Sequence, residues 1–312
     1  MSSQYFRFAV RDTSRLRVPL LEQLLARADG WVSVADWRAD AFRVIAPQAA
    51  CMPAVAAAAL FADRGAVHTD AVSGAWVCAA TPVHYVAEMT SVRLPADGML
   101  ALSPAGAETL ASDFNRVWKG SGIHLTSSVS TGARSAQLFC IFDLTLDVIT
   151  RDPEDVLGRH IEEFLPTGAD SGRLRQLISE TEMWLFEHEA NRARTALNLP
   201  AINGLWFWGG GAPVASLPIV EGWTAGDDLF FNAFSTPRDD KFSSGVIAAG
   251  CAPGSDHWQE VESRWLQAAT DKLRAGEIQR LRISAAERCY TVSARGLRRF
   301  WRRRKPWWES FE

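Results

Sequence analysis

Apolar residues recur at helical spacing in some stretches of the chain and form continuous apolar runs in others. The longest helical pattern covers residues 171–199 and is ended by Pro200. Directly after it, residues 203–211 read NGLWFWGGG, an apolar run typical of a strand buried on both faces. Further helices are predicted at 15–29, 53–62, 103–120 and 255–276, and further strands at 74–89, 123–129, 137–146, 278–284 and 288–294. Because helices and strands alternate irregularly, the pattern predicts an α/β fold with a central mixed sheet flanked by helices.

The three glycines that end the 203–211 strand have two interpretations. Glycine allows a positive φ and a close approach of the backbone to a ligand, so Gly209, Gly210 and Gly211 are ligand-binding candidates. The same residues also suit a core strand that ends in a tight bend. A phosphate loop places a helix directly after its glycines, whereas Pro213 and Pro218 follow in this sequence. A nucleotide-binding loop is therefore not favoured.

The predicted helix 171–199 carries a single polar stripe when its residues are placed at about 100° per residue. The members of the stripe are Arg173, Glu180, Glu187, Asn191 and Arg194. The rest of the helix is mostly apolar and predicts burial, and buried charges must pair with one another or bind something. One interpretation is that the stripe faces solvent or satisfies itself. The other is that Glu180, Asn191 and Arg194, with Glu187 beside them, line a polar cleft that holds an anion or a metal ion.

The composition indicates a globular protein without a strong overall charge. The chain has 312 residues, is 47% hydrophobic and carries 33 basic against 36 acidic side chains. This balance gives no general attraction to nucleic acid or to an anionic membrane. Five scattered cysteines without a CxxC pair fit a reducing compartment, and neither a secretory signal nor a transmembrane segment is recognisable. A cytoplasmic location is expected.

Prolines and glycines cluster between residues 153 and 172 and mark a loop-rich joint. We place the domain boundary before this joint. The expected division is an N-terminal α/β part over 1–150 and a C-terminal α/β part over 151–312, with one continuous domain as the alternative.

Seven of the eleven residues from Arg295 to Lys305 are basic, and aromatic residues are interleaved with them. Such a segment can bind single-stranded nucleic acid through phosphate contacts and stacking, or lie on an anionic membrane surface. The favoured interpretation is that the aromatic residues pack against the body while the cations pair with acidic residues of the same chain. The cations of this basic tail are Arg298, Arg299, Arg302, Arg303, Arg304 and Lys305, and its aromatic residues are Phe300, Trp301, Trp307 and Trp308.

Four segments together resemble a known bacterial family. They are PVHYVAEMTSVRL (82–94), LPTGADSGRLRQLISETEMWLFEHEANRAR (165–194), LPAINGLWFWGGG (199–211) and LRRFWRRRKPWW (297–308). They look like the RpfE-type regulatory proteins, which are described as similar to cofactor-independent phosphoglycerate mutase of the alkaline-phosphatase-like superfamily. The resemblance covers most of the chain in order. It implies a phosphoglycerate-mutase-like α/β shape.

The mutase chemistry that this resemblance implies needs two divalent metal ions, held by Asp and His clusters, and a Ser nucleophile. In this sequence only His257 stands next to an aspartate, and no HxxxH pair occurs. We therefore expect the mutase shape without its two-metal site, and no metal or other cofactor. Asn203 and His84 lie inside family-like motifs and are kept as ligand-binding candidates, although a structural hydrogen bond from His84 to a backbone carbonyl is favoured.

The sequence thus favours a non-enzymatic regulatory or ligand-binding protein whose partner is a small anionic ligand or another protein. The expected functional surface is a cleft between helix 171–199 and the glycines 209–211. The alternative is a phosphomutase or phosphatase-like enzyme that acts on a small phosphorylated metabolite. A second alternative, not favoured, is a nucleic-acid-binding regulator that acts through residues 298–305.

Overall fold

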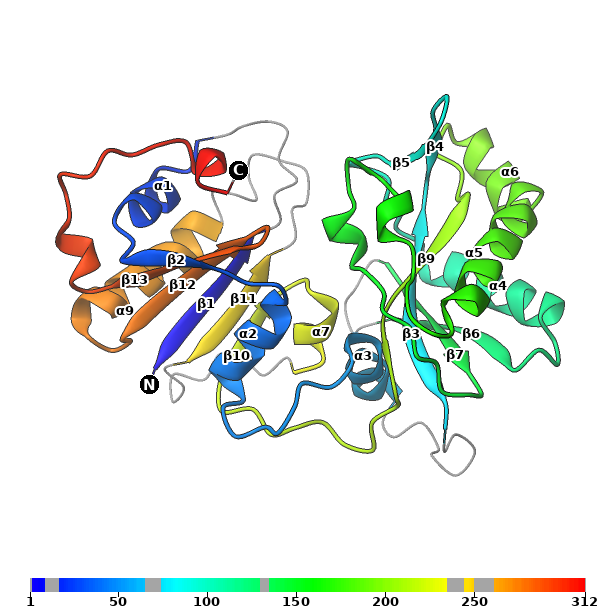
Figure 1. The fold of residues 1–312 in the computed structure, drawn as a ribbon, viewed down its shortest axis with the longest axis horizontal. Helices are drawn as coiled ribbons and strands as arrows, with labels where there is room; N and C mark the ends of the chain where they lie inside the picture. The colour runs from blue at the N-terminus through cyan, green and yellow to red at the C-terminus, as the bar shows by residue number, and fades with distance from the viewer. Residues whose placement is uncertain are drawn as a thin grey trace. The chain divides into compact units, whose positions relative to one another are not determined.

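The computed structural model describes residues 2–8, 17–64, 74–129, 135–234, 244–249 and 261–311. It divides into two compact units, drawn in Figure 1. Unit 1 combines Met1–Met52 with Pro218–Glu312, and unit 2 is Pro53–Leu217. This division differs from the boundary expected near residue 150, because strands from both sides of that position pair within one sheet of unit 2.

The six-stranded sheet of unit 1 is mixed, as predicted. Its strand order is β10 (Trp223–Gly226), β11 (Gly245–Ala249), β1 (Ser3–Phe8), β12 (Arg280–Ala285), β13 (Arg288–Ser293) and β2 (Gly30–Ser33). The first four strands run parallel to one another, and β13 and β2 continue the sheet in antiparallel pairing. The sheet therefore brings together strands from the beginning and the end of the chain.

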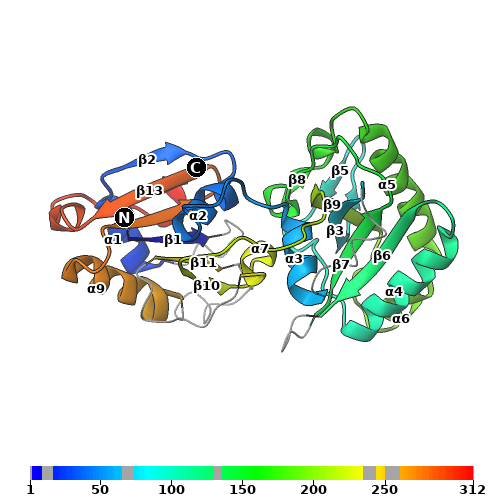
Figure 2. The same cartoon turned by 90° about the horizontal axis from the view of Figure 1, so that it is seen from below.

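The helices of unit 1 cover both faces of this sheet. They are α1 (Pro19–Ala26), α2 (Trp37–Ile45), the short α7 (Leu229–Asn232) and α9 (Gln267–Ala275), with a π-helical turn at Val261–Leu266 and 3-10 turns at Gly296–Arg298 and Trp307–Ser310. Side chains alternate along β1, so Phe6 and Phe8 enter the apolar core with α1 and α9. Tyr5 and Arg7 point to the other face, where α2 lies (Figures 1 and 2).

Unit 2 is built on an antiparallel sheet. Its strand order is β6 (Ile123–Ser128), β7 (Gln137–Phe142), β3 (Trp76–Val83) and β9 (Gly204–Gly211), and a smaller sheet contains β4 (Val86–Ala87), β5 (Val92–Leu94) and β8 (Arg159–His160). Strand β9 is the predicted NGLWFWGGG strand. It is buried on both faces, because Leu205 and Phe207 join the core on one side while Trp206 and Trp208 are buried on the other.

Helices pack on both faces of the unit 2 sheet. They are α3 (Val55–Arg64), α4 (Pro104–Val117), α5 (Ser171–Phe186) and α6 (Glu189–Ala196), with 3-10 turns at Pro153–Asp155 and Glu162–Phe164. As predicted, Ser103 caps α4 by accepting a hydrogen bond from the backbone N–H of Gly106 at 3.2 Å. Among the helices of the described ranges, none is long and apolar enough to cross a membrane.

The single helix expected over 171–199 is two helices, α5 and α6. His188 leaves the helical conformation with φ −68° and ψ 138°, and its Nδ1 accepts a hydrogen bond from the N–H of Ala190 at 3.1 Å. The other ring nitrogen lies 3.3 Å from a carboxylate oxygen of Asp113 on α4. Glu187 therefore ends α5 and His188 caps α6, so the predicted polar stripe does not continue from Glu180 to Arg194 on one helix face.

Candidate functional site

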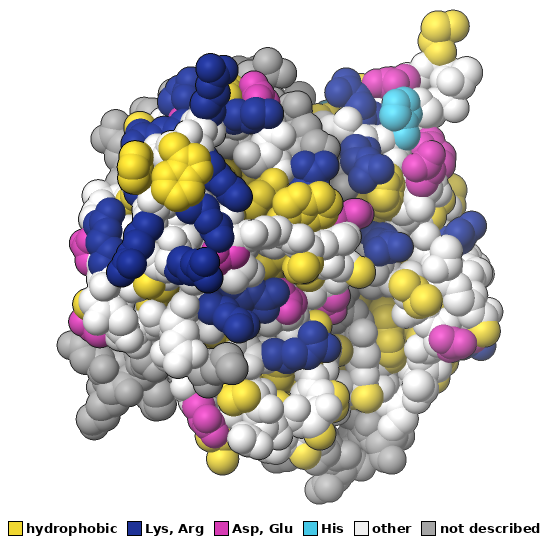
Figure 3. Space-filling model, turned by 60° about the vertical axis from the view of Figure 1, so that its left-hand side comes forward, with side chains coloured by type: hydrophobic (Ala, Val, Ile, Leu, Met, Phe, Trp, Pro, Cys, Tyr) yellow, Lys and Arg dark blue, Asp and Glu magenta, His cyan; other side chains and the backbone are white. Residues whose placement is uncertain are grey.

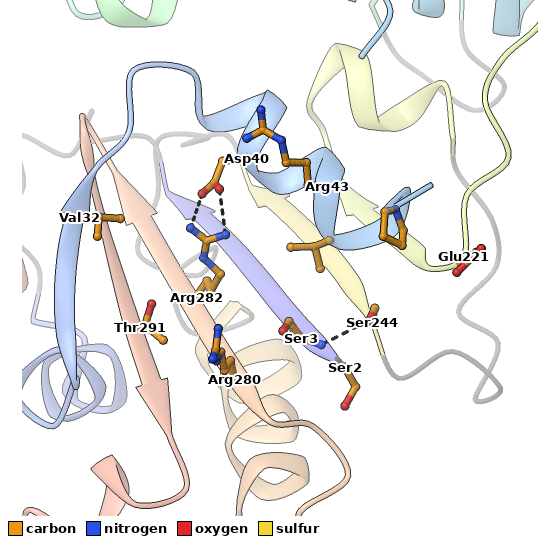
Figure 4. A pocket seen from close by; sticks show the side chains of 12 residues that line it. Ser2, Ser3, Val32, Asp40, Arg43, Glu221, Ser244, Arg280, Arg282 and Thr291 are labelled. Carbon is orange, nitrogen blue, oxygen red and sulfur yellow. Dashed lines mark hydrogen bonds and ion pairs between the residues drawn. The ribbon is translucent and has the colours of Figure 1, made fainter. Parts of the chain in front are cut away.

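Unit 1 contains a cavity of about 610 Å³ between α2 and the sheet (Figure 4). It is lined by Ser2, Ser3, Val32, Asp40, Arg43, Val44, Pro47, Glu221, Ser244, Arg280, Arg282 and Thr291. A volume of this size is in the range of small-molecule sites. The lining holds three guanidinium groups and four hydroxyl groups against two carboxylates, so its chemistry suits an anion.

The strand register explains why two of the arginines reach the same cavity. In β12, residues 280 and 282 are two apart, so their side chains leave the same face of the sheet. The neighbouring strand β1 places Ser3 opposite Arg280 and Tyr5 opposite Arg282. Figure 4 shows both arginines on the side of the sheet that α2 covers.

Arg282 is held in place by Asp40 of α2. Its Nη1 and Nη2 donate to the two carboxylate oxygens at 2.9 and 2.5 Å, and the two side chains are 21% and 18% exposed. Below this pair, the guanidinium of Arg282 lies 5.3 Å from the centre of the Tyr5 ring. Burial raises the pKa of Tyr5, so its hydroxyl stays protonated. Asp40 therefore neutralises one of the three cations of the cavity.

Arg43 and Arg280 are the two remaining cations of the cavity. Both are exposed, and neither forms an ion pair within the described residues. Hydroxyl groups line the same cavity. Ser3 starts β1 and Ser244 directly precedes the neighbouring strand β11, and the Ser3 N–H donates to the Ser244 side-chain oxygen at 3.3 Å. Two guanidinium groups beside several hydroxyl groups are the donor set that phosphate and carboxylate groups bind.

Sequence reasoning did not single out these residues. The available signal was the alternation Arg280-Leu281-Arg282 in a strand that was predicted correctly, because two basic side chains then share one face of a sheet. Asp40 and Arg43 lie three apart in α2 and so share a helix face. Nothing local in the sequence indicates that these two faces meet.

The candidates on α5 are explained by contacts within unit 2. Glu180 accepts hydrogen bonds from Gln176 at 2.7 Å and from the Trp118 indole N–H at 3.4 Å. Glu187 ends α5 and is exposed. Neither carboxylate forms an ion pair with Arg194 within the described residues. The interpretation that the charges of the stripe pair with one another is therefore wrong.

The candidates on α6 bond to the chain that enters β9. The Asn191 amide group donates to the carbonyls of Leu185 and Ile202 at 2.7 and 2.8 Å and accepts from the Ile202 N–H at 2.7 Å. Arg194 donates to the Pro200 carbonyl at 2.6 Å, and burial lowers its pKa. These contacts account for the polar atoms of Asn191 without a ligand.

His84 and Asn203 also bond to backbone. The His84 Nδ1 lies 2.8 Å from the Ala201 carbonyl oxygen, and because a carbonyl only accepts, this nitrogen carries the proton. The Asn203 amide group donates to the Tyr85 carbonyl at 2.9 Å and accepts from the Tyr85 N–H at 2.6 Å. The two side chains thus tie the end of β3 to the start of β9.

The three glycines of β9 form a bulge and a close packing contact. Val77 and Ala79 of β3 face Gly211 and Trp208 of β9, so β9 has one extra residue, and Gly209 has a φ of +64°. A Cβ atom on Gly209 would lie 2.9 Å from Val55, and one on Gly211 would lie 2.5 Å from Ala54. A Cβ on Gly210 would overlap the Trp76 ring. Helix α3 and Trp76 occupy the space that a ligand would need beside these Cα atoms.

The basic tail is fixed to unit 1, and the predicted contacts are present only in part. Arg299 pairs with Asp29 at 2.9 Å, whereas Arg302 donates to the carbonyl of Ala28 at 2.9 Å and Arg304 to the side-chain oxygen of Gln23 at 3.0 Å. The remaining cations, Arg298, Arg303 and Lys305, are exposed. Among the aromatic residues, Trp307 is buried, Trp308 is half-buried, and Phe300 and Trp301 are exposed. The expectation that all four pack against the body is wrong for Phe300 and Trp301.

The described residues do not fit a divalent metal centre. No three His, Cys, Asp or Glu side chains in the described ranges lie close enough together to hold an ion. Asp228, at the carboxyl end of β10, accepts from Arg38 at 2.7 Å and from the N–H groups of Phe230 and Phe231 at 3.0 Å. Its oxygens are occupied by these donors. His257 and the neighbouring Asp256 lie outside the described residues.

Comparison with known proteins gives one local sequence match. A stretch of 72 residues, 23% of this chain, is 35% identical to a 2,3-bisphosphoglycerate-independent phosphoglycerate mutase of Methanothrix thermoacetophila. The matched stretch spans 18% of the length of that enzyme. No protein-family model matches the chain.

Two solved structures are similar to the whole chain at a low level. A cofactor-independent phosphoglycerate mutase of Thermoplasma acidophilum is 11% identical with a TM-score of 0.36, and the match covers 94% of this chain and 89% of that one. The PH0037 protein of Pyrococcus horikoshii is 9% identical with a TM-score of 0.36, and the match covers 94% of this chain and 87% of that one. Likenesses at this level carry no argument about function.

Proposed function

We propose that this chain is a regulatory ligand-binding protein whose ligand is a small phosphorylated carboxylic acid, bound in the cavity between α2 and the sheet of unit 1. The observation that carries the proposal is the pair Arg43 and Arg280, two cations without a carboxylate partner among the described residues that line one cavity. Arginine is the residue best suited to bind phosphate and carboxylate oxygens, because its planar guanidinium donates two parallel hydrogen bonds.

The ligand class follows from the cavity and from the sequence match. Hydroxyl groups of Ser2, Ser3, Ser244 and Thr291 offer further hydrogen bonds beside the cations. Glu221 adds a negative charge to the lining, which favours a ligand that also carries hydroxyl groups over a bare polyanion. The local identity to a phosphoglycerate mutase makes a phosphoglycerate the first ligand to test.

The cavity lies at a different edge of the sheet from the catalytic sites of most α/β enzymes. The residues that begin β1 and β12 and precede β11 line it, so it lies at the amino ends of the parallel strands. Catalytic sites of open parallel sheets lie outside the carboxyl ends. A binding role at the amino ends therefore leaves the opposite edge free for a separate activity.

The test is a titration of the full chain with 3-phosphoglycerate by calorimetry, with Arg280→Ala and Arg43→Ala as variants. We expect saturable binding by the wild-type chain and at least a tenfold loss of affinity in each variant, about 1.4 kcal/mol each. The matched control is Arg192→Ala, an arginine of unit 2 whose side chain is 75% exposed. Absence of binding by the wild-type chain, or equal affinity in all variants, would contradict the proposal.

A second candidate function is phosphoglycerate mutase activity, which the 72-residue likeness favours. Its test is the interconversion of 2- and 3-phosphoglycerate in the presence of Mn²⁺, combined with metal analysis of the purified protein. Turnover that is lost on chelation and restored by Mn²⁺ would establish this second function. If it also persists in Arg280→Ala, the catalytic centre is separate from the cavity.

A further inference from the structure

Besides the cavity, unit 1 has a second candidate binding surface, which is aromatic and basic, is exposed and is formed by residues 298–305. This segment follows β13 and crosses the end of α1. Arg299 and Arg302 both donate to the carbonyl of Ala28 at 2.9 Å. Ala28 lies two residues beyond the last residue of α1, so these two arginines fix the segment to the turn that follows this helix.

Phe300 and Trp301 project from this fixed segment into solvent. Their side chains are 78% and 67% exposed, although Trp307 a few residues later is 1% exposed in the core. Two large adjacent apolar side chains at this exposure are not explained by packing within the described residues. We call the exposed side chains of Phe300 and Trp301 the apolar tip of this segment.

Cations surround the tip. The exposed ones are Arg298, Arg302, Arg303, Arg304 and Lys305 of the same segment, and Arg274 in the last turn of α9, which pairs with Asp271 at 2.8 Å. Arg27 lies among them, and burial and then the charges of Arg304 and Arg274 lower its pKa. The nearby acid Asp29 is already paired with Arg299. Figure 3 shows hydrophobic side chains on this side of the molecule among closely spaced Lys and Arg side chains.

The ring geometry of the tip favours a lipid bilayer over single-stranded nucleic acid as the anionic partner. Phe300 and Trp301 have ring centroids 5.3 Å apart and an interplanar angle of 82°. Consecutive bases of a single strand stack on roughly parallel rings, so this pair offers no platform for two neighbouring bases. A bilayer interface accepts an apolar tip in any ring orientation, and Trp is enriched at that depth.

We propose that residues 298–305, together with Arg27 and Arg274, form a docking surface for an anionic lipid membrane. Phe300 and Trp301 enter the headgroup region, and the cations contact the phosphates of anionic lipids. Arg299 and Arg302 hold the tip in position through the carbonyl of Ala28, just after α1. The binding is peripheral and reversible, and it is independent of the cavity between α2 and the sheet.

The experiment is sedimentation of the full chain with sucrose-loaded vesicles. One set contains only phosphatidylcholine, and the other contains phosphatidylcholine with a third of phosphatidylglycerol. We expect binding to the second set alone and a decrease in binding at high salt, because the cations supply the attraction. Equal binding to both sets, or binding that salt leaves unchanged, would overturn the electrostatic part of the proposal.

Two double variants separate the tip from the cations. Phe300→Ser with Trp301→Ser removes the tip, and Arg303→Glu with Lys305→Glu reverses two exposed charges of the same segment. Each is expected to weaken vesicle binding at least tenfold, whereas Trp301→Phe retains it. The matched controls are Phe186→Ser, at a side chain of unit 2 that is 84% exposed, and Arg173→Glu, an exposed arginine of the same unit. Neither control is expected to change binding.

A single-stranded oligonucleotide is the competing probe. If the oligonucleotide binds and the anionic vesicles do not, the surface is a nucleic-acid site and the membrane proposal is wrong. If neither probe binds, the proposal is equally overturned. Circular dichroism of each variant confirms that a loss of binding is not a loss of folding.

Discussion

The side-chain amide of Asn191 and the backbone of Ile202 are joined by hydrogen bonds in both directions, at 2.7 and 2.8 Å. A third bond, to the carbonyl of Leu185, connects the same amide group to the last turn of α5. One side chain therefore fixes the end of α5, the start of α6 and the approach to β9. The sequence suggested Asn191 as a ligand contact, whereas in the structure its amide group connects α5, α6 and the chain before β9 by hydrogen bonds.

Replacement of Asn191 by Leu should strongly destabilise unit 2. The side chain is 9% exposed, and its loss leaves the N–H and the carbonyl of Ile202 without their hydrogen-bond partner in a buried place. It also removes the bond to the Leu185 carbonyl, which keeps the His188 N–H as a donor. We expect the free energy of unfolding to fall by about 2–4 kcal/mol, measured by urea denaturation. Glu187→Ala, at an exposed position, should change it by less than about 0.5 kcal/mol. An Asn191→Leu protein of unchanged stability would show that the amide has a role other than this joint.

Gly210→Ala tests whether the glycines of β9 are needed for packing. The new methyl group would overlap the ring of Trp76, which is 3% exposed and cannot move into solvent. We expect a loss of about 1–3 kcal/mol in the free energy of unfolding, as for other overpacked positions. The control is Gly172→Ala in the first turn of α5, where a Cβ meets nothing within 4 Å. That change should stabilise the protein by up to about 1 kcal/mol. If both substitutions behave alike, Trp76 has space to adjust.

The sequence predicted those helices and strands whose signals lie within their own residues. Strand β9 could be predicted because LWFW is apolar at every position. Its two faces are buried against different layers, and the indole N–H of Trp206 finds the carbonyl of Arg151 at 2.8 Å. Helix α4 was indicated by Ser103 and Pro104 at its start. The break at His188 was missed, because the apolar pattern continues through it and only a contact with Asp113 of α4 shows why the chain bends there.

The candidate cavity could not be predicted because its parts are distant in the sequence. Strand β1 reads SQYFRF, and its polar residues Gln4 and Arg7 are buried at 2% and 6% exposure, so the sequence shows no strand pattern. Its neighbours β11 and β12 lie more than 230 residues further along the chain. Arg43 and Arg280 line one cavity only once this non-local sheet has formed.

Asp40→Asn should have opposite effects on stability and on ligand binding. The change removes the charge that holds Arg282 in a largely buried pair, so the free energy of unfolding should fall by about 1–3 kcal/mol. The same change frees a third guanidinium for an anion in the cavity, so the affinity for 3-phosphoglycerate should rise. Asp271→Asn, which breaks a pair with Arg274 whose side chains are about half exposed, should alter neither quantity measurably. A loss of affinity in Asp40→Asn would mean that Arg282 must stay paired to shape the cavity.

The described cysteines should differ sharply in their reaction with a disulfide reagent at mildly alkaline pH. Cys51 is exposed, whereas burial raises the pKa of Cys78 and of Cys289 and keeps both as thiols. Cys51→Ser should therefore remove one fast-reacting thiol equivalent from the folded protein, and Cys78→Ser should remove none. Full reactivity of Cys78 in the native protein would indicate that unit 2 opens readily.

Glu182 on α5 should make the stability of unit 2 depend on pH. Burial raises the pKa of this carboxyl above its ordinary value of 4.5, because the half-buried site disfavours the ionised form. Between the unfolded pKa and the higher folded pKa, the folded state binds more protons than the unfolded state. The free energy of unfolding therefore falls as the pH rises through this window and stays lower above it.

Glu182→Gln removes the ionised form and with it this loss of stability. The variant should melt at a higher temperature than the wild-type protein at pH 7, and the difference should shrink towards zero as the pH falls below the ordinary pKa of a glutamate. Thermal melts followed by circular dichroism between about pH 4 and pH 8 measure both points, within the window set by the ordinary and raised pKa values. Glu187→Gln, at the exposed end of the same helix, is the matched control variant. A variant that is less stable than the wild-type protein at pH 7 would mean that the Glu182 carboxylate is stabilised by a partner and that burial does not dominate its environment.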